Sequence, residues 1–298
     1  MARILTRWSR GGEVLSRYFW CALLCLCYAI AGAQETERPE SVAADGYGPL
    51  QSAINTLMQR HPGLVVSYED AHYRHESDLV DVTDQVRPGT EPRILVAREG
   101  SVYAEYQVRT ESGDLIDPET ALTRLINAYN SGNNPGRFDL SRTGDIFHVV
   151  PEQSLNTEGR WIPEIPILDL RISLLTEDAP AVSVVSQLCG EISRVSGRDV
   201  QWGGVPINLF ASKRIDLLAQ NEMARSVLVR LLNMFEPPLT WQLNYSPMTD
   251  SYMLNIVPAQ GPSLNTSGLL DPPQQPRPAP RGGGGFSPRP SPQDVGID

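Results

Sequence analysis

The sequence predicts an α+β protein made of two small β-α-β-β-α-β-β modules in tandem, with helices packed on short sheets. Three observations support this prediction. One set of elements recurs in the same order along the chain, each set contains two amphipathic helices, and each ends in alternating strands that close on Val-Pro. Two helices on one face of small sheets form an α+β layer arrangement. The 298 residues are 41% hydrophobic, so the chain can bury a core.

Residues 1–33 have the layout of a secretory signal peptide. Four arginines precede an apolar stretch from Phe19 to Ala31, and Ala31-Gly32-Ala33 forms a small-residue cleavage site before Gln34. The stretch is shorter than the ~20 residues of a membrane span. We therefore predict cleavage and a periplasmic location. An uncleaved signal anchor is the alternative. Residues 34–47 are interpreted as an N-terminal linker.

Charge and cysteine content exclude several classes of protein. Cleavage would remove four arginines and Glu13, so the net charge of −10 would become −13. An acidic chain argues against nucleic-acid binding and against strong binding to anionic membranes. Only Cys189 would remain, which excludes an internal disulfide in the mature chain. Cys189 lies on the apolar face of a predicted helix, where a small buried side chain is expected rather than a reactive thiol.

The first predicted module covers residues 48–152. Apolar residues from Leu50 to Met58 recur with helical spacing after Pro49, and a strand follows over 64–68. A second helix is expected after Asp117, which is a favourable capping residue. Ile94–Ala97 and Val102–Val108 are predicted to form an inserted hairpin around Glu99-Gly100.

The second predicted module covers residues 166–258. We expect a helix that ends at Ser196-Gly197 and a later helix capped by Asn221. Its predicted strands and helices are Leu168–Leu174, Val182–Val195, Asp199–Trp202, Arg214–Leu218, Met223–Phe235 and the hairpin Leu239–Pro258.

Three segments of the first module align with segments of the second. Leu122–Tyr129 matches Leu228–Phe235, and four of these eight positions are identical. The other two pairs are Phe138–Ser141 with Trp241–Asn244, and Ile146–Pro151 with Met253–Pro258. Three matches in the same order indicate an internal repeat.

Two further segments connect or follow the modules. Residues 153–165 form a Pro-rich linker in which Trp161 could pack between the modules or serve as a docking patch. Residues 259–298 contain nine prolines and four consecutive glycines, Gly282 to Gly285. This composition predicts a disordered tail, because it cannot bury enough apolar surface to offset chain entropy.

The order of elements over residues 166–258 resembles the secretin/TonB short N-terminal domain, the STN family. The shared features are the opening strand, the helix with its Ser-Gly stop, the two strands, the Leu-rich helix and the closing hairpin. Residues 48–152 match more loosely because of the insertion, and no barrel sequence follows the modules. The resemblance implies a periplasmic module that binds proteins and carries no catalytic or cofactor-binding residues.

One segment offers candidate chemistry. His72 and His75, with Asp70 or Glu76, could supply nitrogen and oxygen ligands to a divalent metal, although a solvated polar loop is the simpler interpretation. The acidic residues Glu76, Asp78, Asp81 and Asp84 could bind calcium or a basic partner, but a solvated face is simpler. His148 lies in a predicted strand, where a surface or hairpin role is expected. No nucleophile motif is present, so we assign no catalytic, cofactor-binding or metal residues.

The sequence thus leads to one main hypothesis and two alternatives. The main hypothesis is a non-enzymatic periplasmic adaptor or accessory of an envelope secretion, pilus or receptor-signalling assembly, with a secretin, pilus-assembly or receptor component as partner. The first alternative is an exported metal-binding or hydrolytic protein that uses the His72/His75 region. The second is a structural spacer whose tail spans the cell wall.

Overall fold

The computed structural model describes residues 39–89, 93–106 and 117–259, and these residues form an α+β structure with six α-helices. This confirms the predicted fold class. Residues 1–33 and the tail from 260 onward lie outside the described residues, so the predictions of a signal peptide and a disordered tail remain predictions.

The first half of the described chain is residues 40–163. Its elements are β1 (Glu40–Gly46), α2 (Pro49–Arg60), β2 (Val65–Glu69), β3 (Leu79–Asp81), α3 (Thr83–Val86), β4 (Leu95–Ala97), β5 (Gly100–Tyr106), α4 (Pro118–Ser131), β6 (Arg137–Thr143), β7 (Ile146–Leu155) and β8 (Trp161–Pro163). A 3₁₀ turn at Glu76–Asp78 precedes β3.

The second half is residues 167–258. After a 3₁₀ turn at Ile167–Asp169, its elements are β9 (Arg171–Pro180), α5 (Ala181–Ser196), β10 (Asp199–Trp202), α6 (Ile207–Ala211), β11 (Arg214–Met223), α7 (Ala224–Leu232), β12 (Leu239–Ser246) and β13 (Ser251–Pro258).

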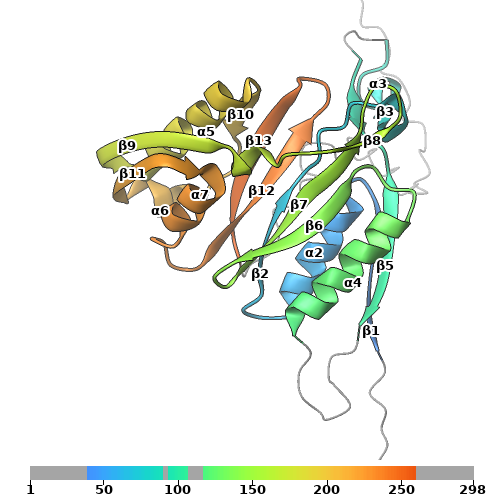
Figure 1. Cartoon of the computed structure of the whole chain (residues 1–298), viewed down its shortest axis with the longest axis horizontal. Coiled ribbons are helices and arrows are strands. Elements are labelled where there is room, and N and C mark those ends of the chain that lie inside the picture. Colours follow the sequence, from blue (N-terminus) through green and yellow to red (C-terminus); the bar gives the residue numbers. More distant parts are fainter. Residues whose placement is uncertain (1–38, 90–92, 107–116, 260–298) are drawn as a thin grey trace, which may run out of the picture.

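Both halves have the same layers. In the first half, α2 and α4 lie between a two-stranded ribbon, β1–β5, and the strands β2, β7 and β6. In the second half, α5 and α7 lie between the ribbon β9–β11 and the strands β12, β13 and β10 (Figure 1). Each helix therefore buries side chains toward a ribbon on one side and toward the larger sheet on the other.

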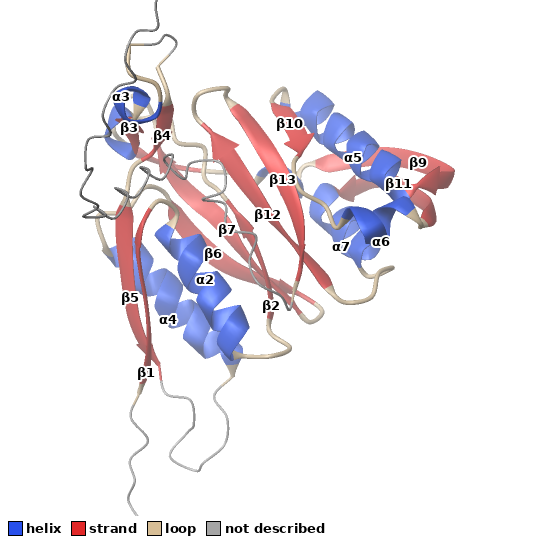
Figure 2. Cartoon of the chain, turned by 180° about the vertical axis from the view of Figure 1, so that it is seen from behind, coloured by secondary structure: helices blue, strands red, loops and turns tan. Residues whose placement is uncertain are grey.

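The two halves share one sheet. Its strand order is β10-β13-β12-β2-β7-β6, and β8 pairs with the end of β7. The parallel pair β12–β2 joins the halves, with Gln242 beside Tyr68 and Leu243 beside Glu69. The helices of the two halves lie on opposite faces of this sheet (Figure 2). The sequence predicts separate small sheets, because a pairing between distant strands has no local signal.

The residues that form the two cores follow from this arrangement. Leu122, Tyr129 and Phe138 belong to the core of the first half. Leu188, Leu228 and Trp241 belong to the core of the second half. Ile146 comes from β7 of the first half, yet it is buried in the core of the second half. The halves therefore bury apolar surface against one another as well as within themselves.

Several predicted elements differ from the structure. β4 and β5 do not form the predicted hairpin with each other, because β4 pairs with β3 and β5 pairs with β1. Asn221 does not cap α7. It lies in β11 with a positive φ of 52°, and the helix begins at Ala224. The opening strand of the second half starts at Arg171, since Ile167–Asp169 forms a 3₁₀ turn. The predicted linker 153–165 contains the end of β7 and β8.

Other local predictions are confirmed. The Asp117 side chain accepts a hydrogen bond from the Glu119 N–H at the start of α4, at 3.2 Å. Gly197 ends α5 with a left-handed backbone at φ 71°, a conformation that glycine adopts without steric cost. Cys189 is buried on α5, and burial raises the pKa of its thiol to about 12.

Candidate functional site at the junction of the two halves

Polar side chains of the shared sheet are buried where the two halves meet. On β2, Val66 and Tyr68 point into the core of the first half, so Ser67 and Glu69 point to the opposite face. In a separate module that face would be exposed to water. Here the second half covers it, and Ser67 and Glu69 are both buried. The strand predicted over 64–68 is present as β2, and its polar face lies in an internal junction.

The second half contributes polar residues to the junction in the same way. Leu239, Trp241 and Leu243 on β12 face the core of the second half, whereas Thr240 and Gln242 face the first half and are buried. The Thr240 hydroxyl donates to the Val66 carbonyl at 2.7 Å. The Gln242 amide donates to Asn55 Oδ1 on α2 at 3.0 Å. Each half thus satisfies polar groups of the other.

A buried ion pair crosses the junction on the side of α7. Arg225 of α7 bonds Glu69 of β2 through Nη1, and its Nε donates to Asp169 Oδ1 at 2.9 Å. Burial raises the pKa of Glu69, and Arg225 acts against this shift. Burial also acts to lower the pKa of Arg225, but the Glu69 and Asp169 carboxylates more than offset it and raise that pKa. Removing Arg225 would leave Glu69 as an unpaired buried charge.

His148 completes this side of the junction. It is fully buried, with Nδ1 2.7 Å from Ser67 Oγ and its ring stacked on Trp241 at 5.2 Å between centroids. His148 does lie in a hairpin, β6–β7, but the surface position is wrong, because the second half covers this face of β7. Burial, with a smaller contribution from Arg225, lowers the pKa of His148 to about 3. The imidazole is therefore neutral at neutral pH.

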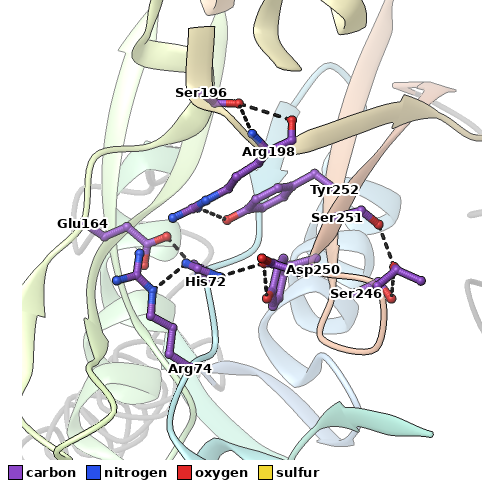
Figure 3. A network of polar contacts seen from close by, with 11 residues as sticks. His72, Arg74, Glu164, Ser196, Arg198, Ser246, Asp250, Ser251 and Tyr252 are labelled. Atoms are coloured by element: carbon purple, nitrogen blue, oxygen red, sulfur yellow. Dashed lines mark hydrogen bonds and ion pairs between the residues drawn. The ribbon is translucent and has the colours of Figure 1, made fainter. Parts of the chain in front are cut away.

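His72 lies in a second polar cluster, at the edge of the junction (Figure 3). Arg74 donates to His72 Nδ1 at 2.6 Å, so the neutral ring carries its proton on Nε2, which donates to Asp250 at 3.1 Å. The backbone N–H of His72 donates to Glu164 at 2.8 Å. Burial, then Arg198 and Arg74, lowers the pKa of His72 to about 4. Asp250 acts in the opposite direction and raises this pKa, but burial and the two arginines outweigh it.

The cluster connects residues from both halves. Figure 3 shows Glu164 between the side chains of Arg74 and Arg198, with Arg198 beside Tyr252 of β13. Arg198 donates to the Tyr252 hydroxyl at 3.4 Å. Neighbouring Asp70 accepts hydrogen bonds from Tyr68 and Tyr73 and from the Tyr245 N–H. Burial raises the pKa of Asp70 to about 6. These contacts position the turn between β12 and β13 against the first half.

His72 and His75 have different surroundings. His75 caps the 3₁₀ turn Glu76–Asp78, where its Nδ1 accepts from the Ser77 N–H, and it is half-buried. His72 instead faces Asp250 of the second half. Within the described residues, no group of three or more His, Cys, Asp or Glu side chains is placed to hold a metal ion. The geometry therefore adds no third ligand to the metal hypothesis.

The remaining singled-out residues have structural surroundings. Asp78 is buried, which raises the pKa of its carboxyl, whereas the Asp81 carboxylate accepts a hydrogen bond from the Thr83 N–H at 2.9 Å. The predicted acidic face is therefore not uniformly solvated. Trp161 of β8 is partly exposed, and the Arg137 guanidinium lies 4.6 Å from the centre of its ring. This contact is within the first half and does not clamp the halves together.

Outside the junction, the two ribbons expose one face each. Alternate residues of β9 and β11 are buried and exposed in the same pattern. Leu175 and Leu218 lie directly opposite each other on the exposed face and are 63% and 55% accessible. The corresponding central pair of the other ribbon is Ala43 with Tyr103. The ribbon of the second half thus presents an apolar cross-strand pair to solvent.

Comparisons with known proteins add no assignment. No family model matches the chain, and no curated protein or solved structure gives a significant match. Among the helices of the described residues, none is both long enough and apolar enough to cross a membrane.

The signals for the junction were present in the sequence but were not distinctive. Ser67, Glu69 and His148 lie on the polar side of alternating strands, where solvent is the default neighbour. Arg225 carries a weak signal, because it lies three and four positions before Leu228 and Val229 and so shares a face of α7 that the structure buries. A buried arginine needs a carboxylate partner, but the sequence does not identify Glu69, 156 residues away, as that partner.

Proposed function

We propose that this chain is an exported, non-enzymatic adaptor that binds a protein of an envelope secretion, pilus or receptor-signalling assembly. In this proposal residues 48–152 and 166–258 are tandem STN-like modules, residues 1–33 direct export, and the partner is a secretin, pilus-assembly or receptor component. The support is the repeated order of elements in the two halves and its resemblance to the STN family.

The observation that carries the proposal is the exposed Leu175–Leu218 pair on the β9–β11 ribbon. Apolar side chains that lie together on a rigid exposed surface are a common feature of protein interfaces. The ribbon is rigid because its inner face packs on α5 and α7, which pack on the shared sheet. We therefore place the partner-binding surface on the outer face of this ribbon.

In-cell photo-crosslinking tests the proposal. A photoreactive phenylalanine analogue is placed at Leu175 in the full-length chain, and the crosslinked proteins are identified by mass spectrometry. The matched control carries the analogue at Tyr103, the exposed central position of the other ribbon. We expect an envelope-assembly component to be crosslinked from position 175 and not from position 103.

A variant that ends at Pro258 separates the ribbon from the tail. If crosslinking from position 175 persists without residues 259–298, the modules bind the partner. If an envelope partner is recovered only with the tail present, the tail carries the binding and the ribbon assignment is wrong. Recovery of no envelope protein from either variant would contradict the adaptor function itself.

A further inference from the structure

The second half contains a duplication on a smaller scale than the two modules. Residues 171–188, which form β9 and the start of α5, align with residues 214–231, which form β11 and most of α7. Eight of these 18 positions are identical, and the two strands have the same burial pattern. Because β9 and β11 pair antiparallel, with Arg171 opposite Met223 and Arg214 opposite Pro180, a local two-fold axis relates them.

Backbone contacts of the ribbon obey this symmetry. Asp178 and Asn221 occupy equivalent positions and both have positive φ, at 45° and 52°. The carbonyl of each accepts from an arginine at the start of the opposite strand, Arg214 for Asp178 and Arg171 for Asn221. The axis passes between Leu175 and Leu218, which are equivalent residues and lie directly opposite each other. The two strands should therefore have equivalent free edges.

The free edges differ in how they are protected. An exposed strand edge can pair with another chain, and proteins usually block it. On β11, Arg230 donates to the Leu218 carbonyl at 2.7 Å. On β9, the residue equivalent to Arg230 is Gln187, whose amide donates to Ser183 Oγ at 3.2 Å instead. Among the described residues, no side chain bonds the Leu175 carbonyl in the same way.

The other ribbon has both edges blocked. On β1, the Arg60 side chain donates to the Ser41 carbonyl at 2.7 Å. On β5, the Asn134 amide bonds both the N–H and the carbonyl of Ser101, each at 3.0 Å. Of the four ribbon edges in the described residues, β9 is therefore the one on which no side chain from outside the ribbon bonds a backbone group.

The charged side chains on the outer face of β9 are placed so that two antiparallel copies of this strand would bring opposite charges together. The exposed side chains that alternate along it are Arg171, Ser173, Leu175 and Glu177; Asp178, which pairs with Arg214, and Pro180 are also exposed at the end of the strand. If a second β9 pairs antiparallel about Leu174, Arg171 of each copy lies opposite Glu177 of the other, and Ser173 lies opposite Leu175. The register is also compatible with the backbone. In an antiparallel pair, the N–H and C=O groups of two opposite residues either bond each other or both point away from the partner strand. Leu175 and Leu218 are opposite each other, and Arg230 bonds the Leu218 carbonyl from outside the ribbon. The N–H and C=O of Leu175 therefore point to the free edge of β9.

We propose that the free edge of β9 pairs with β9 of a second copy of this chain. The two ribbons then form a four-stranded sheet with the order β11-β9-β9-β11, and the interface is the same patch on both copies. Both Leu175–Leu218 pairs lie on one face of this sheet. Self-association is independent of the proposed adaptor function, and if that function holds, the dimer doubles the partner-binding surface. An interface made by one strand from each copy is small, so we expect dimerisation to depend on protein concentration.

Sedimentation velocity over a concentration series tests the proposal. The protein is purified from cells that express the full-length chain. We expect the wild type to dimerise, and Arg171→Glu and Glu177→Arg each to weaken dimerisation by about tenfold, because each places like charges opposite one another. The double variant R171E/E177R restores complementary pairs and dimerises like the wild type. Equal amounts of the two single variants form a heterodimer. Gln220→Arg, at the position on β11 equivalent to Glu177, is the matched control and leaves dimerisation unchanged.

Two results would overturn the proposal. One is a wild-type chain that stays monomeric at every concentration, which would leave the β9 edge to a different occupant such as an envelope partner. The other is dimerisation that both single charge variants retain at wild-type strength, since the dimer would then use another surface. Circular dichroism spectra of all variants establish that each is folded. Neither result bears on the crosslinking from position 175, so the adaptor function and the dimer can fail separately.

Discussion

The two sides of the junction bury polar groups by different means. On the side of α7, three buried groups are ionisable, namely Glu69, Arg225 and His148. On the side of α2, they are neutral, with Gln242 bonded to Asn55 and Thr240 bonded to the Val66 carbonyl. Both sides satisfy hydrogen bonds between the halves, yet the physical cost of a missing partner differs greatly. Loss of one hydrogen bond on the neutral side costs little stability, whereas loss of a charged partner on the side of α7 costs much more.

This difference bears on how the two halves are held together. A neutral hydrogen bond contributes about 0.5–1.5 kcal/mol to stability. A buried charge without its partner costs several kcal/mol, because it has lost its hydration. The charged side therefore disfavours any arrangement in which one half moves away while Glu69 stays buried. The junction makes the halves one rigid body, and substitutions on its two sides test this statement.

Arg225→Met has the largest expected effect. The side chain keeps much of its apolar length, but Glu69 loses its cation while 1% exposed. We expect the free energy of unfolding in urea at pH 7 to fall by about 3–5 kcal/mol. Adding Glu69→Gln to this variant removes the unpaired charge and should recover part of the loss. A loss below about 1 kcal/mol for Arg225→Met would mean that the pair is hydrated in solution and the junction is open.

His148→Gln has an intermediate effect that depends on pH. The pKa of His148 falls from 6.5 to about 3 on folding, so the folded protein disfavours the protonated ring. The stability that this contributes is fully present above pH 6.5 and is lost as the pH falls toward 3. Between these values the wild type loses up to about 1.4 kcal/mol per pH unit from this group. The glutamine variant lacks this loss while it can still bond Ser67.

Urea denaturation of both proteins between pH 7.5 and pH 5 measures the difference. His72, with a pKa lowered to about 4, adds a loss of the same sign. Asp70, with a pKa raised to about 6, has the opposite sign and adds stability as the pH falls. Both groups are present in both proteins, so their contributions cancel in the comparison. Parallel stability curves for the two proteins would show that His148 is solvated.

The sequence predicted most elements because their signals are local. Pro49, Asp117 and Gly197 each act within one turn of a helix, and the structure places helix ends beside all three. The alternation of Val66 with Ser67 likewise determines which residues share a strand face. Asn221 was misassigned because an Asn before a helix is a common cap, whereas here its tolerance of positive φ serves the corner at the end of β11.

The junction could not be predicted because its pairs are distant in sequence. The pair Glu69–Arg225 spans 156 residues, and Gln242 lies 187 residues from Asn55. From sequence alone, a polar strand face is predicted to be exposed to solvent, because no local signal identifies the element that covers it. The predicted pairing of β4 with β5 failed for a similar reason. The turn at Glu99-Gly100 predicts a local hairpin, but β4 pairs with β3 and β5 pairs with the distant β1.

Gln242→Ala has the smallest expected effect and sets the reference for the neutral side. It removes the bond to Asn55 and leaves that amide beside the sheet. We expect a loss of about 1 kcal/mol in unfolding free energy. A double-mutant cycle with Asn55→Ala isolates the pair and should give a coupling of about 0.5–1.5 kcal/mol. A coupling as large as the effect of Arg225→Met would remove the contrast between the two sides. A small coupling at this partly buried pair would mean that neutral bonds set the register of β12 on β2, while the charged side keeps the halves together.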